Sequence, residues 1–278
     1  MTNLQQRVLA GLIALPLLFV SIWLGSPYFF CGLVLVTTLL GLHEFFLLVE
    51  KIGFHPVRAA GFAMMLVIEG LFFLNQPGSD WFLITIGASL MLMMIWSILT
   101  SKTTEDFQKV LVSHATTLFG VMYVGFLASF LIRLKLLASP HLGSQLLSLF
   151  FMVIMAGDTF AYFTGRALGR HKLAPTISPG KTIEGSCGGI VGSIAFALLA
   201  RFWFFPQLPL IHAIVLAIVM NLVGQLGDLY ESLLKRGSGT KDAAAIIPGH
   251  GGLLDRLDSL LFNAPILYYY IHFWPFNT

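Results

Sequence analysis

Long apolar segments with few charged residues recur along the whole 278-residue chain. A helix needs roughly 20 such residues to cross the hydrocarbon core of a bilayer. Hydrophobic residues make up 57% of the sequence and charged residues only 10%, whereas about a quarter of a soluble domain is charged. The pattern therefore predicts an all-α, polytopic integral membrane protein with about nine transmembrane helices, at about residues 8–25, 28–49, 59–75, 81–99, 110–132, 145–164, 184–204, 210–228 and 259–275.

Lysine and arginine fall unevenly between the alternate segments that connect these spans. If the N-terminus lies inside, thirteen of the sixteen Lys and Arg residues fall in inside segments, and only Arg133, Lys135 and Arg201 fall outside. Inside loops of membrane proteins are the basic ones. We therefore predict an N-terminus inside, a C-terminus outside and a cytoplasmic segment 229–258. The first span is predicted to be retained rather than cleaved, because a second apolar segment follows it after a very short turn.

Net charge and cysteine content exclude several classes of protein. A net charge of +3 is too small to indicate nucleic-acid binding. Cys31 and Cys187 both lie in apolar stretches, so they indicate neither a disulfide framework nor a thiolate zinc site. No internal repeat stands out, so we predict a single membrane-embedded domain over residues 1–278, with N-terminal helices in about 1–140 and a catalytic half in about 141–278.

The first of three polar clusters is GDTFAYFTGRALGRHKL, which begins at Gly157. Asp158, Tyr162 and Arg166 are spaced i, i+4 and i+8, so a helix presents all three on one face. Asp158 is placed about two turns inside the predicted membrane boundary, where an acidic side chain is costly and usually faces the protein interior or a wet cavity. Either it bonds to Tyr162 or Arg166 as a structural group, or it belongs to a substrate cavity.

The second cluster, SPGKTIEG, begins at Ser178 and resembles part of a phosphate-binding loop. The Walker pattern requires a glycine where this sequence has Pro175, so that pattern fails. What remains is a predicted helix start, with Lys181 at its beginning and Thr182 and Glu184 in its first turn. Backbone N–H groups at a helix start can receive an anion. The alternative is a capped helix whose lysine only sets topology.

The third cluster begins within the predicted span 210–228. Asn221, Gln225, Asp228 and Ser232 step by four, three and four, which places them in one polar stripe of a helix. Polar groups are unfavourable against lipid, so we predict that this stripe faces the protein interior.

The stripe leads into the most polar segment of the chain, KRGSGTKDAAAIIPGHGGLLDRLD, residues 235–258. Its glycines let backbone amides approach a ligand closely. Asp255 and Asp258 are spaced i, i+3 at a predicted helix start. Paired carboxylates beside glycines and cations suit Mg²⁺, which is held by one or two carboxylates and by substrate phosphates. Zinc fits worse, because His250 has no nearby partner at metal-ligand spacing. A solvated basic loop that only sets topology is the simpler alternative.

The run SLLKRGSGTKDAAAIIPGHGGLLDRLD, which ends at Asp258, resembles the family pattern of the phosphatidate cytidylyltransferases, the CDP-diacylglycerol synthases of bacterial type. The resemblance extends to GDTFAYFTGR and SPGKTIEG and so covers the C-terminal half well. The N-terminal half resembles the family in hydropathy and at His43–Glu44. The sequence departs from the family at Gly180 and Ile183, where a basic residue and a tryptophan are more usual.

This resemblance implies transfer of a cytidylyl group from CTP to phosphatidate, which gives CDP-diacylglycerol and pyrophosphate for phospholipid synthesis. Positioning and charge neutralisation carry most of such catalysis. The implied catalytic residues are Lys241, Asp242, His250, Asp255, Arg256 and Asp258. Those implied to bind substrate are Asp158, Tyr162, Arg166, Ser178, Lys181, Thr182, Glu184, Asn221, Ser232, Lys235, Arg236, Gly249, Gly251 and Gly252. Mg²⁺ is expected on Asp228, Asp255 and Asp258, with room for a second cation. We assign Lys241 to the CTP phosphates and Lys181 to the lipid phosphate.

The expected partners are CTP, phosphatidate and the lipid bilayer, without nucleic acid and with a homodimer left open. The expected location is the bacterial cytoplasmic (inner) membrane, with the active site at its cytoplasmic side. Two alternative functions remain open. A transporter or flippase of an anionic lipid would share the intramembrane polar groups, but it predicts polar clusters at both ends or at midplane in repeated halves. A CTP-dependent polyprenol kinase would release CDP instead of pyrophosphate.

Overall fold

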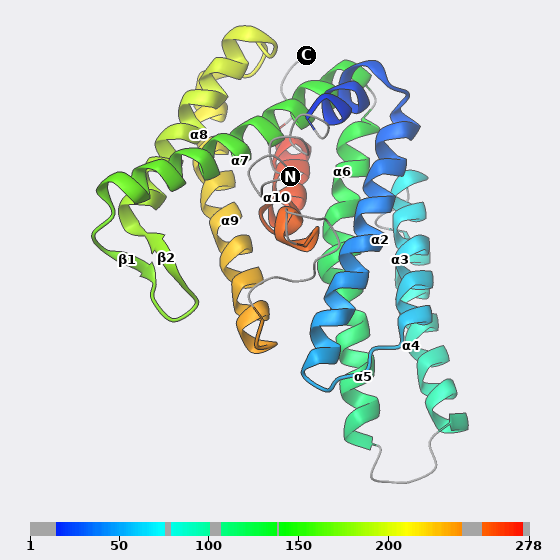
Figure 1. Ribbon diagram of the computed structural model, residues 1–278. Coiled ribbons are helices and arrows are strands. Elements are labelled where there is room, and N and C mark those ends of the chain that lie inside the picture. Colours follow the sequence, from blue (N-terminus) through cyan, green and yellow to red (C-terminus); the bar gives the residue numbers. More distant parts are fainter. Residues whose placement is uncertain (1–14, 76–78, 101–106, 138, 241–251, 275–278) are drawn as a thin grey trace. The chain divides into compact units, whose positions relative to one another are not determined.

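The computed structural model describes residues 15–75, 79–100, 107–137, 139–240 and 252–274, and most of its regular structure is helical (Figure 1). The chain divides into two compact units, residues 1–133 with 234–257 and residues 134–233 with 258–278. Among the described helices, six are long and apolar enough to cross a membrane. The prediction of an all-α, polytopic membrane protein is confirmed.

Six predicted spans coincide with these helices, which cover Pro27–Lys51, Asp80–Leu99, Gln108–Lys135, His141–Leu168, Ile183–Trp203 and Leu210–Gly237. The last of them continues beyond the predicted end at residue 228, into the segment that we expected to be a loop. Shorter or more polar helices occupy the predicted spans 59–75 and 259–275, and residues 1–14 lie outside the described part. The count of nine spans therefore stays a prediction.

The first unit is built mainly from the N-terminal helices (Figure 1). In chain order these are η1 (Val20–Leu24), α2 (Pro27–Lys51), α3 (Arg58–Phe73), α4 (Asp80–Thr100), α5 (Phe107–Gly120), η3 (Val121–Phe126) and α6 (Leu127–Lys135). The elements η1 and η3 are short π-helical stretches. Helix α2 starts where its sequence favours a start, because the Ser26 side chain accepts a hydrogen bond from the Tyr28 N–H and proline follows as the first helical residue.

Aromatic side chains and glycines make the core of this unit. The rings of Phe72 and Phe130 are fully buried and meet nearly edge to face, with their centroids 4.9 Å apart, a favourable geometry for aromatic pairs. A Cβ atom added at Gly120 would lie 2.6 Å from the Phe45 ring. Glycine is therefore what allows α2 and α5 to pack this closely.

Helix α4 differs from its neighbours because only 6% of its apolar stretch is buried within the protein. Its exposed side chains include Leu92, Ile95 and Ile98. A helix that is apolar on nearly all sides is buried in a large core or in a membrane. The exposed faces of α4 therefore suit contact with lipid.

The second unit contains α7 (Pro140–Leu168), β1 (Lys172–Ala174), β2 (Ser178–Thr182), α8 (Ile183–Trp203), most of α9 (Leu210–Gly237) and most of α10 (Leu254–Phe273). Helices α7 and α8 pack against each other (Figure 1). A Cβ atom added at Gly185 would lie 3.2 Å from the Cα of Gly165. Small residues thus bring the two backbones together, as they do in other membrane helix pairs.

Strands β1 and β2 form a short antiparallel hairpin, with Lys172 opposite Thr182 and Ala174 opposite Ser178. The sequence analysis did not predict this hairpin, and it placed Lys181 at a helix start. That placement was wrong, because Lys181 lies on β2. The predicted cap is present one residue later. The Thr182 side chain accepts a hydrogen bond of 3.1 Å from the Gly185 N–H, so α8 begins at Ile183 with a capped first turn.

Candidate active site

Three carboxylates gather between two helices of the second unit. Among the described residues, Asp228 and Glu231 of α9 and Asp258 of α10 offer carboxylate oxygens that all lie within 4.8 Å of one another. Glu231 is fully buried, Asp258 is 8% exposed and Asp228 is half-buried. Carboxylates packed this closely repel one another unless a cation or protons accompany them. Carboxylate oxygens are hard ligands that suit Mg²⁺ or Ca²⁺ better than they suit zinc.

The close approach of α9 and α10 creates this cluster. A Cβ atom added at Gly227 would lie 2.5 Å from the backbone oxygen of Asp258. No side chain other than hydrogen fits there without moving one of the two backbones. Gly227 therefore lets Asp258 reach the same side of α9 that carries Asp228 and Glu231.

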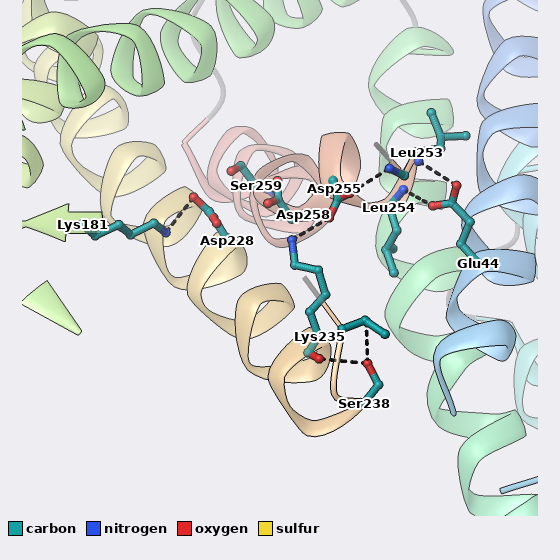
Figure 2. Close-up of polar contacts among 12 residues, drawn as sticks. Glu44, Lys181, Asp228, Lys235, Ser238, Leu253, Leu254, Asp255, Asp258 and Ser259 are labelled. Atoms are coloured by element: carbon teal, nitrogen blue, oxygen red, sulfur yellow. Dashed lines mark hydrogen bonds and ion pairs between the residues drawn. The ribbon is translucent and has the colours of Figure 1, made fainter. Parts of the chain in front are cut away.

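One lysine extends to the edge of the cluster. The Nζ of Lys181, on strand β2, lies 2.6 Å from the Oδ2 of Asp228 (Figure 2). Both side chains are partly exposed, at 22% and 37%. Asp158 of α7 lies close enough to interact electrostatically with both of them. The hairpin thus places a cation beside carboxylates that come from two different helices.

The predicted polar stripe on α9 faces the protein interior, as the sequence indicated. The Asn221 amide donates to the Ser193 hydroxyl at 3.0 Å, and the Gln225 amide donates to the Asn221 side-chain oxygen at 2.5 Å. Ser186 of α8 donates to the Gln225 oxygen at 2.6 Å. On the opposite face, Leu226 is 58% exposed. The stripe therefore joins α9 to α8 by one buried and one partly buried hydrogen bond, the kind of contact that holds membrane helices together where lipid provides no hydrophobic driving force.

Glu184 holds the hairpin to the start of α8. Its carboxylate accepts from the backbone N–H groups of Arg170 and His171, at 3.1 and 3.2 Å, and its Oε1 lies 2.7 Å from the His171 Nδ1. These contacts hold the residues that lead into β1, the strand that pairs with the one on which Lys181 lies. In the described structure, Glu184 therefore ties the start of the hairpin to α8, and its role in substrate binding stays a prediction.

Helix α7 carries Asp158, Tyr162 and Arg166, as predicted. A hydrogen bond joins Arg166 to Tyr162, whereas the structural alternative required a bond from Asp158. The Arg166 guanidinium donates to the Tyr162 hydroxyl at 3.1 Å. In the part of the chain that the structure describes, Asp158 forms a hydrogen bond with neither of them. Asp158 is instead exposed and lies near Lys181 and Asp228. This environment favours the interpretation that Asp158 belongs to the site.

The start of α10 belongs to the first unit and holds a separate polar network (Figure 2). Lys235 donates from its Nζ to the Asp255 Oδ1 at 2.6 Å, and the Gly252 N–H donates to the Asp255 Oδ2 at 2.8 Å. The carboxylate of Glu44, on α2, accepts from the N–H groups of Leu253 and Leu254. Asp255 is thus engaged by a lysine and a backbone amide and is not one of the three clustered carboxylates.

Comparison with known proteins identifies the family. The model of the cytidylyltransferase family matches residues 5–274. This chain belongs to the cytidylyltransferase family. It is 32% identical to the phosphatidate cytidylyltransferase of Synechocystis, over 96% of both chains. It is 31% identical to that of Brucella abortus, over 96% of this chain and 93% of the relative. It is 50% identical to that of Bacillus subtilis over 120 residues, which are 42% of this chain and 44% of the relative.

The structure of this cytidylyltransferase brings together some of the predicted site residues. Asp158, Lys181, Asp228 and Asp258 lie in one neighbourhood of the second unit, and Lys235, Gly252 and Asp255 are bonded together in the first. Ser178 and Ser232 are half-buried on β2 and α9, and Arg236 and Arg256 are exposed. The predictions for Lys241, Asp242, Gly249, His250 and Gly251 lie outside the described residues. The roles of all these residues stay predictions.

The sequence did not identify two residues of the cytidylyltransferase, Glu231 and Glu44, as part of the site. Glu231 follows Asp228 by three positions, so the helical period that revealed the polar stripe could also have found it. Glu44 was noticed only as part of a family resemblance. Its partners are 209 and 210 residues away in the sequence, and no local pattern predicts such a contact.

Proposed function

We propose that this cytidylyltransferase transfers the cytidylyl group of CTP to phosphatidate and so produces CDP-diacylglycerol and pyrophosphate. The observation that carries the proposal is the cluster of Asp228, Glu231 and Asp258 with Lys181 at its edge, in a membrane-spanning unit. A lipid phosphate and a nucleotide triphosphate both need charge neutralisation, and a membrane setting admits the acyl chains. The relatives from Synechocystis and Brucella abortus, which align over nearly their whole length, carry this activity in their names.

The reaction requires positioning more than a strong base. A phosphate oxygen of phosphatidate attacks the α-phosphorus of CTP. As the new P–O bond forms, the bond from the α-phosphorus to the oxygen that bridges it to the β-phosphorus breaks, and pyrophosphate leaves with that electron pair. The nucleophile is already an anion, so no proton has to be removed from it. The protein must bring two anions together and stabilise the charge of the leaving group.

We assign the metal to Asp228, Glu231 and Asp258. The three carboxylates fit Mg²⁺ by donor type and by their separation. When bound, Mg²⁺ would neutralise phosphate charge and stabilise the pyrophosphate that leaves. Asp255 was predicted as a further ligand. Because Asp255 bonds to Lys235 and to the Gly252 N–H, we propose that it holds the start of α10, and its role as a metal ligand stays a prediction.

Lys181 is assigned to the lipid phosphate. It is half-buried on the hairpin of the second unit, and its ion pair with Asp228 keeps its charge beside the carboxylates proposed to hold the metal. A cation there lies next to the place where phosphate oxygens would approach the metal. The assignment of Lys241 to the CTP phosphates stays a prediction, because Lys241 lies outside the described residues.

We also propose a location and an orientation. The chain is a multi-pass membrane protein with bacterial relatives, which favours the bacterial cytoplasmic membrane. The excess of Lys and Arg in alternate segments favours an N-terminus inside, a C-terminus outside and an active site at the cytoplasmic side. A homodimer stays a prediction.

Analysis of the products tests the reaction. Purified protein is incubated with Mg²⁺, phosphatidate and CTP that carries separate labels on the cytidine and on the γ-phosphate. We expect the cytidine label in the lipid and the γ-phosphate label in pyrophosphate. A γ-phosphate label in the lipid, together with free CDP, would instead establish a kinase. Movement of lipid across the bilayer without a covalent product would establish a transporter.

Single substitutions test the metal assignment. Asp258→Asn and Glu231→Gln should each lower the rate by about 100-fold, the scale of losing one preorganised electrostatic contact, and should raise the Mg²⁺ concentration required for half-maximal rate. Glu50→Gln is the matched control, because Glu50 lies on α2 and pairs with Arg58. If Asp255→Asn raises the Mg²⁺ requirement while Glu231→Gln does not, the assignment of Glu231 is wrong.

A further inference from the structure

Glu44 binds the start of a helix that is far away in the sequence. It lies on α2 and is fully buried. Its Oε1 accepts from the Leu253 N–H at 2.8 Å and its Oε2 accepts from the Leu254 N–H at 2.7 Å (Figure 2). These two N–H groups lie at the beginning of α10. A single carboxylate thus satisfies two adjacent backbone donors within the first unit.

The contact satisfies a specific need of α10. The first N–H groups of a helix have no partner inside the helix, and buried donors without a partner are costly. A negative charge also interacts favourably with the positive end of the helix dipole. The position that Glu44 occupies is one where a helix start could otherwise receive a phosphate. Glu44 therefore serves as a built-in anion for these two N–H groups.

A second set of bonds fixes the same place. Asp255, in the first turn of α10, accepts from the Gly252 N–H and from Lys235 near the end of α9. The Lys235–Asp255 ion pair is well shielded, with side-chain exposures of 15% and 13%. It joins the two ends of the segment that links α9 to α10. Lys241, Asp242 and His250, which were predicted to act in catalysis, belong to this segment.

We propose that Glu44 is a positioning residue for this reaction. Through the N–H groups of Leu253 and Leu254 it fixes the start of α10. Through Asp255 it positions Lys235, which is predicted to bind substrate and lies shortly before the predicted CTP-binding Lys241 in the sequence. Helix α2 then contributes to substrate binding through Glu44, without Glu44 itself touching substrate. The expected effect of Glu44 on catalysis rests on the proposed function. The contact between Glu44 and the start of α10 does not.

Two substitutions of Glu44 separate positioning from folding. Glu44→Gln keeps one acceptor oxygen but loses the charge, and Glu44→Ala loses both bonds. We expect kcat/KM for CTP to fall by about 10-fold in the first variant and about 100-fold in the second, since a misplacement of about 1 Å can cost that much. KM for phosphatidate should change less. Glu50→Gln, a change of the same type on the same helix, should leave kcat/KM for CTP within about twofold.

Hydrogen exchange measures the anchor without any catalysis. In purified protein without substrate, peptides covering residues 252–257 should exchange faster in Glu44→Gln than in wild type, and in Glu44→Ala faster still. The same peptides should exchange at the wild-type rate in Glu50→Gln.

The outcomes separate the two proposals. If Glu44→Gln is fully folded at the assay temperature and has the wild-type kcat/KM for CTP, Glu44 has only a structural role and the inference is overturned. Unchanged exchange at 252–257 in both variants would also overturn it. If wild-type protein makes no CDP-diacylglycerol, the proposed function fails, whereas faster exchange in the variants would still establish the anchor.

Discussion

Replacing Gly227 with alanine tests whether the contact between α9 and α10 builds the acidic cluster. The added Cβ atom would lie 2.5 Å from the backbone oxygen of Asp258. That distance is roughly 1 Å short of ordinary van der Waals contact. A backbone oxygen cannot rotate away as a side chain can, so one helix must move relative to the other. The movement would carry Asp258 away from Asp228 and Glu231.

The expected magnitude follows from two opposing effects. Overpacking a well-packed contact costs about 1–3 kcal/mol, and alanine regains up to about 1 kcal/mol of helix propensity over glycine. Because the backbone oxygen cannot move aside, we take the upper end of the first range. The expected net loss is then about 2 kcal/mol, which corresponds to a fall in Tm of about 4–8 °C for a chain of this size. A shift of about 1 Å in the cluster should also lower activity by about 100-fold.

Gly237→Ala is the matched control. Gly237 ends the same helix, and no atom lies within 4 Å of its added Cβ position. This variant should keep full activity, with a Tm that is unchanged or slightly higher because alanine favours the helix. Thermal unfolding in detergent and cytidylyl transfer are measured for both variants. If Gly227→Ala has the Tm and rate of wild type, the close approach of α9 and α10 does not build the site.

Three further predictions concern other parts of the chain. Thr182→Val removes the side-chain cap of α8, so Tm should fall by about 2–4 °C, the effect of about 1 kcal/mol; an unchanged Tm would show that the hairpin alone holds this helix start. A reporter fused after Thr278 should behave as periplasmic, and a cytoplasmic signal would remove one predicted span. Lys181→Ala should lower kcat/KM for phosphatidate more than for CTP, and Lys241→Ala should do the reverse; equal losses would indicate one shared cluster of cations.

Patterns among neighbouring residues were sufficient to predict several features of the second unit. The four-three-four spacing of Asn221, Gln225, Asp228 and Ser232 predicted an inward stripe, and the structure places hydrogen bonds to α8 along it. The sequence also predicted a helix start within SPGKTIEG, with a capped start as one alternative; α8 begins there at Ile183, and Thr182, which was expected in the first turn, is its cap. Both predictions succeeded because the period of a helix and the chemistry of its first turn depend only on neighbouring residues.

Patterns among neighbouring residues could not predict contacts between residues that are far apart in the sequence. The i, i+3 spacing of Asp255 and Asp258 suggested one paired site, and it could not indicate that Asp255 bonds to Lys235 or that Asp258 lies beside Asp228 and Glu231. That both bind metal stays a prediction. The hairpin was also missed, because strands of three and five residues leave almost no periodic signal. Lys181 owes its place beside Asp228 to that hairpin.

Hydropathy, charge and short-range spacing by themselves determined that this chain is a helical membrane protein and where its polar clusters lie, and the resemblance of its motifs to a known pattern indicated the family. These are properties of single residues and of neighbours within a few helical turns. Only the tertiary structure decided which carboxylates meet. The cluster depends on a glycine that lets two helices touch, and the start of α10 depends on Glu44, 209 residues away from its first partner. Such contacts arise from the packing of whole helices, because a buried carboxylate must find donors or a cation wherever the fold provides them.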